Sequence, residues 1–140
     1  MKQRRAKFKD ELEWTLIQLQ NSVYEYEGRA HFPILQAKAY EIFLKKHSNS
    51  KISEVVLQKI ALLYRIAAEC IEEDFYEHDL LIEDNTEFSE DDIDLFRNEA
   101  VRIYKDLSKS KNAVISESAK VSLFNIKSER CYYSGDMHDW

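Results

Sequence analysis

Two pairs of carboxylates have the spacing of metal ligands on helices. Glu69 and Glu72 are three residues apart, and so are Asp91 and Asp94. Positions i and i+3 project from the same side of a helix, and carboxylate oxygens are preferred ligands of divalent cations. Two facing helices that carry such pairs could bind magnesium and assist the hydrolysis of a nucleoside triphosphate.

This spacing resembles the E-x-x-E and E-x-x-D helices of the all-α nucleotide pyrophosphohydrolases, and the resemblance implies a metal-dependent enzyme. Acid-rich segments, however, contain pairs of this spacing by chance, and Glu87 with Glu90 is a further example. Asp91 would also lie in the first turn of a helix, where the macrodipole favours a carboxylate without any metal. The pyrophosphohydrolase is therefore an alternative interpretation, and our leading interpretation includes no metal ligand and no cofactor.

Other reactive side chains lack the partners that catalysis needs. Asp74 and His78 are one helical turn apart, and His78-Asp79 resembles the His-Asp centre of the helical metal-dependent phosphohydrolases, but no companion motif supplies further ligands. Cys70 lies on an apolar helix face, which predicts a small buried side chain rather than a nucleophile. Nothing in the sequence near Cys131 indicates an activated thiol. We therefore predict no catalytic residue.

Charge is strongly segregated along the chain. Residues 69–99 contain 14 acidic residues and one basic residue, Arg97, whereas the rest of the chain contains 12 acidic and 19 basic residues. Aromatic and aliphatic residues are interleaved with these acids, which is the composition of an interface that combines apolar anchors with electrostatic steering. The predicted contact residues are Glu72, Glu73, Asp74, Phe75, Tyr76, Glu77, Asp79, Leu80, Glu83 and Asp84.

The basic residues concentrate at the start of the chain, where Lys2, Arg4, Arg5, Lys7 and Lys9 occur within one expected helix. The macrodipole disfavours positive charge at a helix N-terminus, so local stability does not explain them. No aromatic stacking platform accompanies them, and the isoelectric point of about 5.3 argues against direct nucleic-acid binding. We expect residues 1–8 to form a frayed, solvated start.

The amino-acid composition indicates an all-helical fold. The chain has 140 residues but only two Gly and one Pro, too few for the many tight turns of an all-β domain. Its size suits one hydrophobic core, so we expect a single domain over residues 1–140. The longest apolar run has five residues, from Ile60 to Tyr64, which fits neither a signal-peptide core nor a membrane span. With two cysteines far apart, we expect a cytoplasmic protein that does not bind membranes.

Five helices are expected from apolar periodicity and capping signals, over about residues 3–27, 33–47, from 53, 89–109 and 116–135. The third helix either continues towards Ile82 or breaks in the acidic segment, and residues 134–140 form a loose tail. The expected apolar faces are Leu12, Leu16, Leu19, Val23 and Tyr26; Leu35, Ala39, Ile42 and Phe43; Ile60, Leu63, Ala67 and Cys70; Ile93, Phe96, Ala100, Ile103 and Leu107; and Ala119, Leu123 and Ile126. The third helix is the most hydrophobic and should lie at the centre.

The sequence thus predicts an all-α, single-domain bundle of about five helices, mostly antiparallel. Its general character is that of small acidic helical binding proteins, such as immunity proteins that neutralise basic nuclease toxins. Our leading interpretation is an inhibitor or immunity-type module that binds a basic nuclease or other nucleic-acid-binding protein. The alternatives are the pyrophosphohydrolase and a homo-oligomeric structural subunit, for example a homodimer through the first helix.

Overall fold

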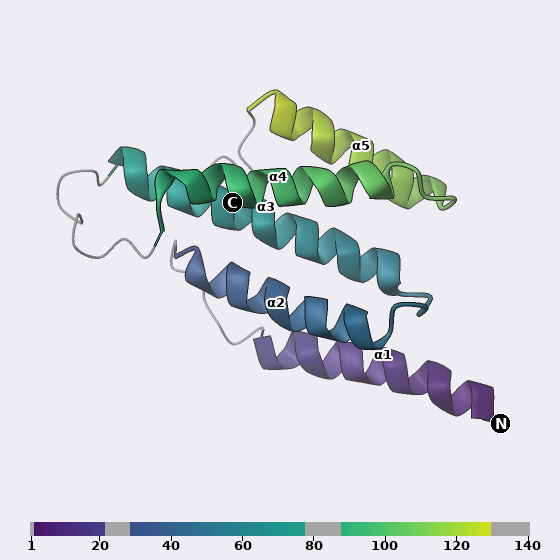
Figure 1. The fold of residues 1–140 in the computed structure, drawn as a ribbon. Helices are drawn as coiled ribbons and strands as arrows, with labels where there is room; N and C mark the ends of the chain where they lie inside the picture. Colours follow the sequence, from purple (N-terminus) through teal and green to yellow (C-terminus); the bar gives the residue numbers. More distant parts are fainter. Residues whose placement is uncertain (1, 22–28, 78–87, 130–140) are drawn as a thin grey trace, which may run out of the picture.

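The computed structural model describes residues 2–21, 29–77 and 88–129, with side chains for 9–20, 29–74 and 88–129. These residues form five α-helices and no β-strand: α1 (Lys2–Asn21), α2 (His31–Lys46), α3 (Ser53–Glu77), α4 (Glu90–Leu107) and α5 (Ala113–Lys127). Consecutive helices run in opposite directions, with α1 and α5 on the two outer sides (Figure 1). The predicted all-α antiparallel bundle is confirmed. No helix in the described ranges has both the length and the apolar character needed to cross a membrane.

The central element is α3, which packs extensively against α4 and α2 and also touches α5. Ile60, Leu63, Ala67 and Cys70 are all buried, as the periodicity predicts. Further buried residues extend the apolar surface around the helix: Val56, Ala61, Tyr64, Ile66, Ala68 and Ile71. A helix that is apolar around most of its circumference is stable only when neighbours cover it on several sides. The backbone of α3 continues to Glu77, so the helix extends into the acidic segment.

The start of α4 follows the capping signal in the sequence. Ser89 precedes the first helical residue, and its backbone N–H donates to the carboxylate of Asp92 at 2.8 Å. The predicted face is confirmed, because Ile93, Ala100, Ile103 and Leu107 are buried and Phe96 is partly buried. The ring of Phe96 stacks on Tyr64 of α3, with centroids 5.6 Å apart and an interplanar angle of 11°.

The predicted bounds of the last helix are wrong at both ends. α5 begins after Asn112, whose side-chain oxygen accepts hydrogen bonds from the backbone N–H groups of residues 114 and 115. Ser116, the predicted cap, lies inside the helix, and its hydroxyl donates to the carbonyl oxygen of Ser108 at 2.7 Å. The helix ends at Lys127, because Glu129 adopts a φ of 57°, in the left-handed region that commonly terminates helices. It therefore stops before Gly135.

The predicted buried face of α2 is also partly wrong. Leu35 and Ile42 are exposed, at 53% and 70%, while the buried side includes Ile34, Ala37 and Tyr40. Pro33 lies in the first turn, and the helix ends beside His47, as predicted. Apolar residues occur around most of this helix, so the sequence pattern is compatible with two alternative buried faces. The buried face is the one that lies between α1 and α3.

The predicted leucine stripe of α1 does not face the bundle. Leu12, Leu16 and Leu19 are 61%, 49% and 60% exposed. The helix packs on α2 through Trp14 instead, which is 7% exposed and lies edge-on to Tyr40 at a centroid distance of 4.6 Å. The side of α1 that faces the bundle is therefore the side of Trp14 and not the side of the three leucines. Val23 and Tyr26, the other residues of the stripe, lie outside the described residues, as do Gly28 and the predicted end of this helix.

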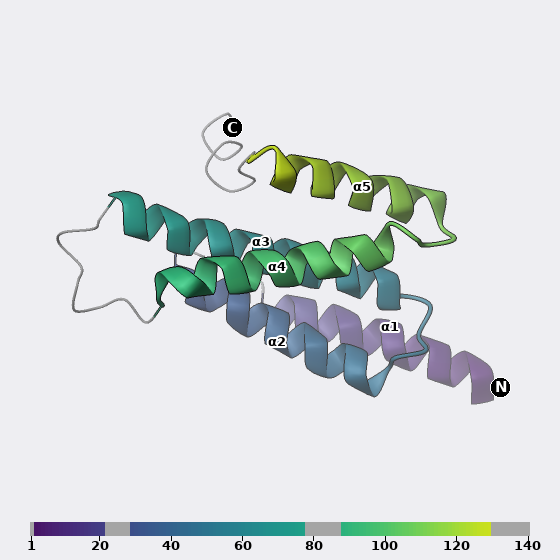
Figure 2. The ribbon, with the colours of Figure 1, turned by 45° about the horizontal axis from the view of Figure 1, so that its top comes forward.

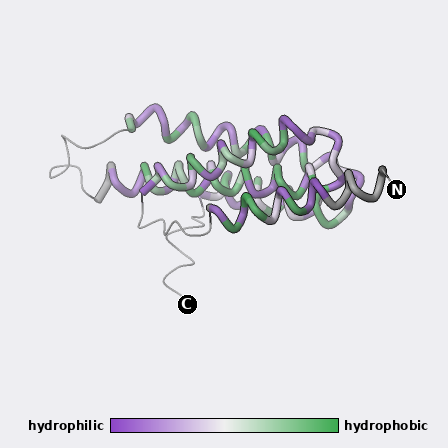
Figure 3. Tube along the Cα trace, turned by 90° about the horizontal axis from the view of Figure 1, so that it is seen from below, coloured by the Kyte–Doolittle hydropathy of each residue, from purple (hydrophilic) through white to green (hydrophobic). Residues whose placement is uncertain are grey.

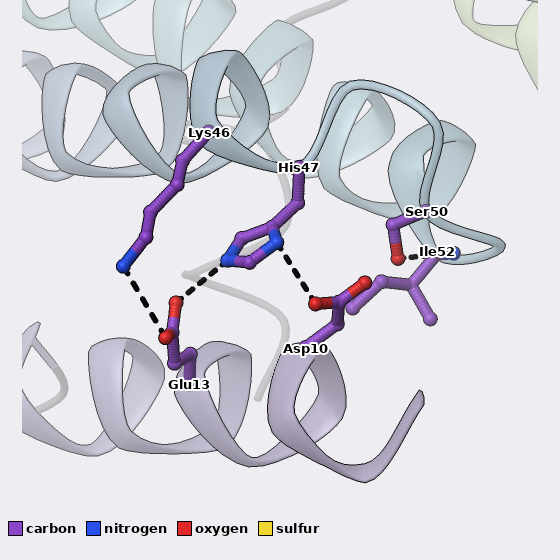
Figure 4. A network of polar contacts seen from close by, with 6 residues as sticks. All are labelled: Asp10, Glu13, Lys46, His47, Ser50 and Ile52. Carbon is purple, nitrogen blue, oxygen red and sulfur yellow. Dashed lines mark hydrogen bonds and ion pairs between the residues drawn. The ribbon is translucent and has the colours of Figure 1, made fainter. Parts of the chain in front are cut away.

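A polar network also attaches α1 to the end of α2 (Figure 4). His47 Nδ1 lies 2.8 Å from Asp10 Oδ1, and His47 Nε2 lies 2.7 Å from Glu13 Oε2. Lys46 Nζ lies 3.3 Å from the other oxygen of Glu13. A carboxylate only accepts hydrogen bonds, so a ring nitrogen of His47 that carries a proton can donate to the carboxylate beside it. Hydrogen bonding to His47, helped by Lys46, keeps the pKa of Glu13 below its ordinary value of 4.5.

The first prediction concerns the cap of α5. We expect Asn112→Ala to lower the free energy of unfolding by about 1 kcal/mol, because two backbone N–H groups lose their acceptor. Urea unfolding followed by circular dichroism measures this. Asn98→Ala, at an exposed interior position of α4, is the control and should leave stability unchanged or slightly higher. Equal effects of the two substitutions would show that Asn112 is not the cap.

The second prediction concerns the pH dependence of α1 packing. The pKa of Glu13 is lowered on folding, so its carboxylate stabilises the folded state above about pH 4.5, and this contribution is lost as the pH falls through the lower folded value. In a Trp140→Phe background, Trp14 fluorescence reports whether α1 is packed on α2. We expect Glu13→Gln to red-shift the emission at neutral pH, relative to wild type, and the difference to disappear in acid.

The control for this experiment is Glu11→Gln, at an exposed position on the same helix. It removes one carboxylate from α1 but none from the His47 network, so its emission should follow wild type at every pH. A Glu13→Gln difference that persists unchanged at acidic pH would contradict the assignment of Glu13 to this network.

Candidate functional site

Acidic residues of α3 and α4 converge at one end of the bundle. α3 runs towards this end and α4 starts from it, so the last turns of α3 lie beside the first turns of α4 (Figures 1 and 2). We call the described carboxylates gathered there the acidic end; they are Glu72, Glu73, Asp74, Glu90, Asp91, Asp92 and Asp94. The fold therefore joins two stretches that are more than ten residues apart in the sequence.

The ion pair between Glu72 and Arg97 links the two helices at the inner edge of the acidic end. Both side chains are partly exposed, at 40% and 36%, so the pair contributes little to stability, typically under about 1 kcal/mol. Its main consequence is electrostatic, because Arg97 is the single basic residue between positions 69 and 99. In the sequence this segment has 14 acidic residues and no other Lys or Arg.

Helix dipoles explain the acids of α4 but not those of α3. Glu90, Asp91 and Asp92 occupy the first turn of α4, where the partial positive charge of the helix N-terminus stabilises carboxylates. At the other end of a helix the partial charge is negative and disfavours them. The last turn of α3 nevertheless contains Glu77 and no basic residue, and Glu73 and Asp74 come just before that turn. The acids of α3 therefore oppose the dipole of their own helix.

The structure describes only part of the predicted contact surface. Glu72, Glu73 and Asp74 are half-buried residues of α3. Phe75, Tyr76 and Glu77 belong to its last turn, but their side chains lie outside the described residues. Asp79, Leu80, Glu83 and Asp84 lie wholly outside the described residues. The aromatic and aliphatic anchors thus stay predictions.

Sequence reasoning missed the contribution of α4 to this surface. The predicted contact residues include no acid of α4, although Glu90, Asp91, Asp92 and Asp94 all belong to the acidic segment of residues 69–99. The available signal was topological: two helices joined by a connector run antiparallel, so the end of one lies next to the start of the other.

The four residues of the alternative metal site are divided between α3 and α4, and two of them have basic partners. Glu72 of this set is paired with Arg97 of α4. Glu69 lies 3.4 Å from Arg65 on its own helix, and both side chains are at most 10% exposed. Within the described residues, no group of three or more His, Cys, Asp or Glu could hold a metal ion. The geometry gives the pyrophosphohydrolase interpretation no support.

The environment of Cys70 is that of a structural thiol. Its side chain is fully buried in α3, as predicted. Burial raises the pKa of Cys70 to about 12, and the fields of Glu73 and Asp74 act in the same direction. A thiol with this pKa is protonated at neutral pH and is a poor nucleophile. Cys131 and His78 lie outside the described residues.

We compared the chain with family models, curated proteins and solved structures, and no match was found in any of the three comparisons. The acidic end is therefore the feature from which a function can be argued.

Proposed function

We propose that this protein is an interaction module whose acidic end binds a basic protein. The observation that carries the proposal is the convergence of carboxylates from α3 and α4 on one end of the bundle. The acids of α3 are the stronger part of this observation. They oppose the dipole of their own helix, so helix stability does not explain their presence. A partner that presents Lys and Arg residues supplies that reason.

The partner that best fits this chemistry is a protein that binds nucleic acid. Such proteins present basic surfaces to phosphate groups, and carboxylates distributed over two helices can occupy the same surface. Binding would then exclude the nucleic acid, which is the action of an inhibitor or immunity-type protein. We place this function in the cytoplasm, where a buried free thiol such as Cys70 stays reduced.

Electrostatics would act mainly on the rate of association. A cluster of acidic residues attracts an oppositely charged surface before contact, and this raises the association rate by about 10-fold or more at low salt. Added salt screens the attraction over a Debye length of about 8 Å at physiological ionic strength. Salt-sensitive binding is therefore the expected signature of the acidic end.

The third prediction tests this signature with the full chain as bait in a host-cell lysate. We expect the wild type to capture a basic protein at low salt and to lose it at high salt. Glu73→Gln/Asp74→Asn removes two charges from the acidic end and should slow the association of the purified partner by about 10-fold at low salt, as measured by surface plasmon resonance. If the partner is a nuclease, cleavage of its substrate should be inhibited by wild type and less by the variant.

The matched control is Asp106→Asn/Glu117→Gln, which removes the same number of carboxylates from exposed positions on α4 and α5. It changes the net charge equally but leaves the acidic end intact, so its association rate should follow wild type. Thermal unfolding of both variants checks that folding is preserved. Equal association rates for wild type and Glu73→Gln/Asp74→Asn, or a captured partner with an acidic surface, would exclude the proposed docking mode.

A further inference from the structure

A second surface, on α1, has the character of an interface. Leu12, Leu16 and Leu19 form one exposed stripe, which we call the leucine face. The opposite side of the helix, with Trp14 and the partly buried Ile17, packs on α2. Of the helices described, only α2 packs against α1, and the leucine face is exposed on the side away from α2. A helix that is apolar on two opposite sides requires a second neighbour.

The spacing of the leucine face is that of a two-helix seam. Intervals of four and then three residues place the leucines at alternating a and d positions of a heptad, which is the pattern of coiled-coil contacts. Thr15 and Gln20, beside the seam, are uncharged. Glu13, the charged residue beside it, is turned towards His47 and Lys46 of α2 (Figure 4). No charge at these positions would repel an identical helix.

Exposed apolar residues of α2 extend this surface. Leu35 and Ile42 are two helical turns apart, and Ile42 is one turn from Lys46, so all three lie on one side of α2. Lys46 reaches Glu13, which is one turn from Leu16 on α1. The apolar surface thus continues from the leucine face across the ion pair to α2. Figure 3, which views the molecule from the α1 side, shows hydrophobic positions recurring along the helices.

The charge distribution indicates the occupant. The five basic residues at the start of α1 lie towards one end of the molecule, and the acidic end lies towards the other (Figures 1 and 2). Two copies that pair through α1 in antiparallel orientation place the basic start of each copy towards the acidic end of the other. Parallel pairing would instead bring like charges together at both ends. We propose that the leucine face binds a second copy of this chain, with the two α1 helices antiparallel.

In this homodimer the acidic ends, which are formed by α3 and α4, lie outside the leucine face, although the basic start of each copy is directed towards the acidic end of the other. The two copies would be related by a two-fold axis near Leu16, so the interface is self-complementary. The inference rests on the leucine face and the overall charge distribution, and it stands whether or not the acidic end binds a basic partner.

The fourth prediction concerns the mass of the protein in solution. We expect sedimentation equilibrium of the full chain, over a concentration series, to give twice the chain mass of 16.6 kDa. Leu12→Gln/Leu16→Gln/Leu19→Gln should raise the dimer dissociation constant by about 100-fold or more, because it removes the apolar centre of the interface. Gln has a helix propensity close to that of Leu, so α1 itself should persist, and circular dichroism verifies this.

The matched control changes three exposed apolar residues on the other outer helix, as Val114→Gln/Val121→Gln/Phe124→Gln on α5. It removes a comparable apolar surface and should leave the dimer intact. A wild type that is monomeric over the whole series overturns the proposal. So does a control variant that dissociates while the α1 variant stays dimeric, since the interface then lies on α5.

The orientation is tested with spin labels on Arg4→Cys in a Cys131→Ser background, in which the remaining Cys70 is buried. In an antiparallel pair centred near Leu16 the two labelled positions are about 36 Å apart, from 24 residues at 1.5 Å each. In a parallel pair the helix axes are about 10 Å apart and the labels are close together. A long distance by double electron–electron resonance supports the proposed antiparallel dimer, and a short one overturns it.

Discussion

The burial of α3 constrains the positions of the other helices. Its apolar surface extends around most of the cylinder, and water must be excluded from all of it. α2 and α4 cover most of this surface, and α5 completes the cover at one side while it packs on α4. In folded proteins, the packing of an apolar face against neighbouring helices supplies most of the stability of a helix. The acidic end is a consequence of this arrangement, because α4 covers α3 only by running back along it.

The packing of α1 is of a different kind. This helix reaches the core through Trp14, which contacts Tyr40 and Phe43, and through the carboxylates that bind His47. Packing on a single neighbour covers less than half of a helix. α1 can therefore carry two apolar sides, one for the bundle and one for another helix. The tight aromatic contact and the polar network fix which side faces inwards, and this choice exposes the leucines.

The buried face of a helix could be predicted from the sequence where the apolar residues define a single face. α4 has a single apolar face, bounded by a clear start at Ser89, and its buried residues follow the prediction. The apolar surface of α3 was enough to predict its central position, but not how far the helix continues into the acidic segment. The faces of α1 and α2 could not be derived, because both helices have apolar residues on more than one side and periodicity does not say which side has neighbours. The start of α5 was ambiguous because several polar residues before it can act as caps.

The acidic end illustrates the same limit for function. The acids of α3 were recognisable in the sequence, but those of α4 had a sufficient local explanation in the helix dipole. Only the antiparallel packing of the two helices makes them part of one surface.

Residues that do not stabilise the fold give the best indication of function. The acids in the first turn of α4 stabilise their helix and so say little by themselves. The acids near the end of α3 oppose their helix dipole, and the exposed leucines of α1 leave apolar surface in water; both features work against the isolated monomer. Binding partners of opposite charge and matching apolar surface would relieve both penalties. The two surfaces are therefore better explained by association than by folding.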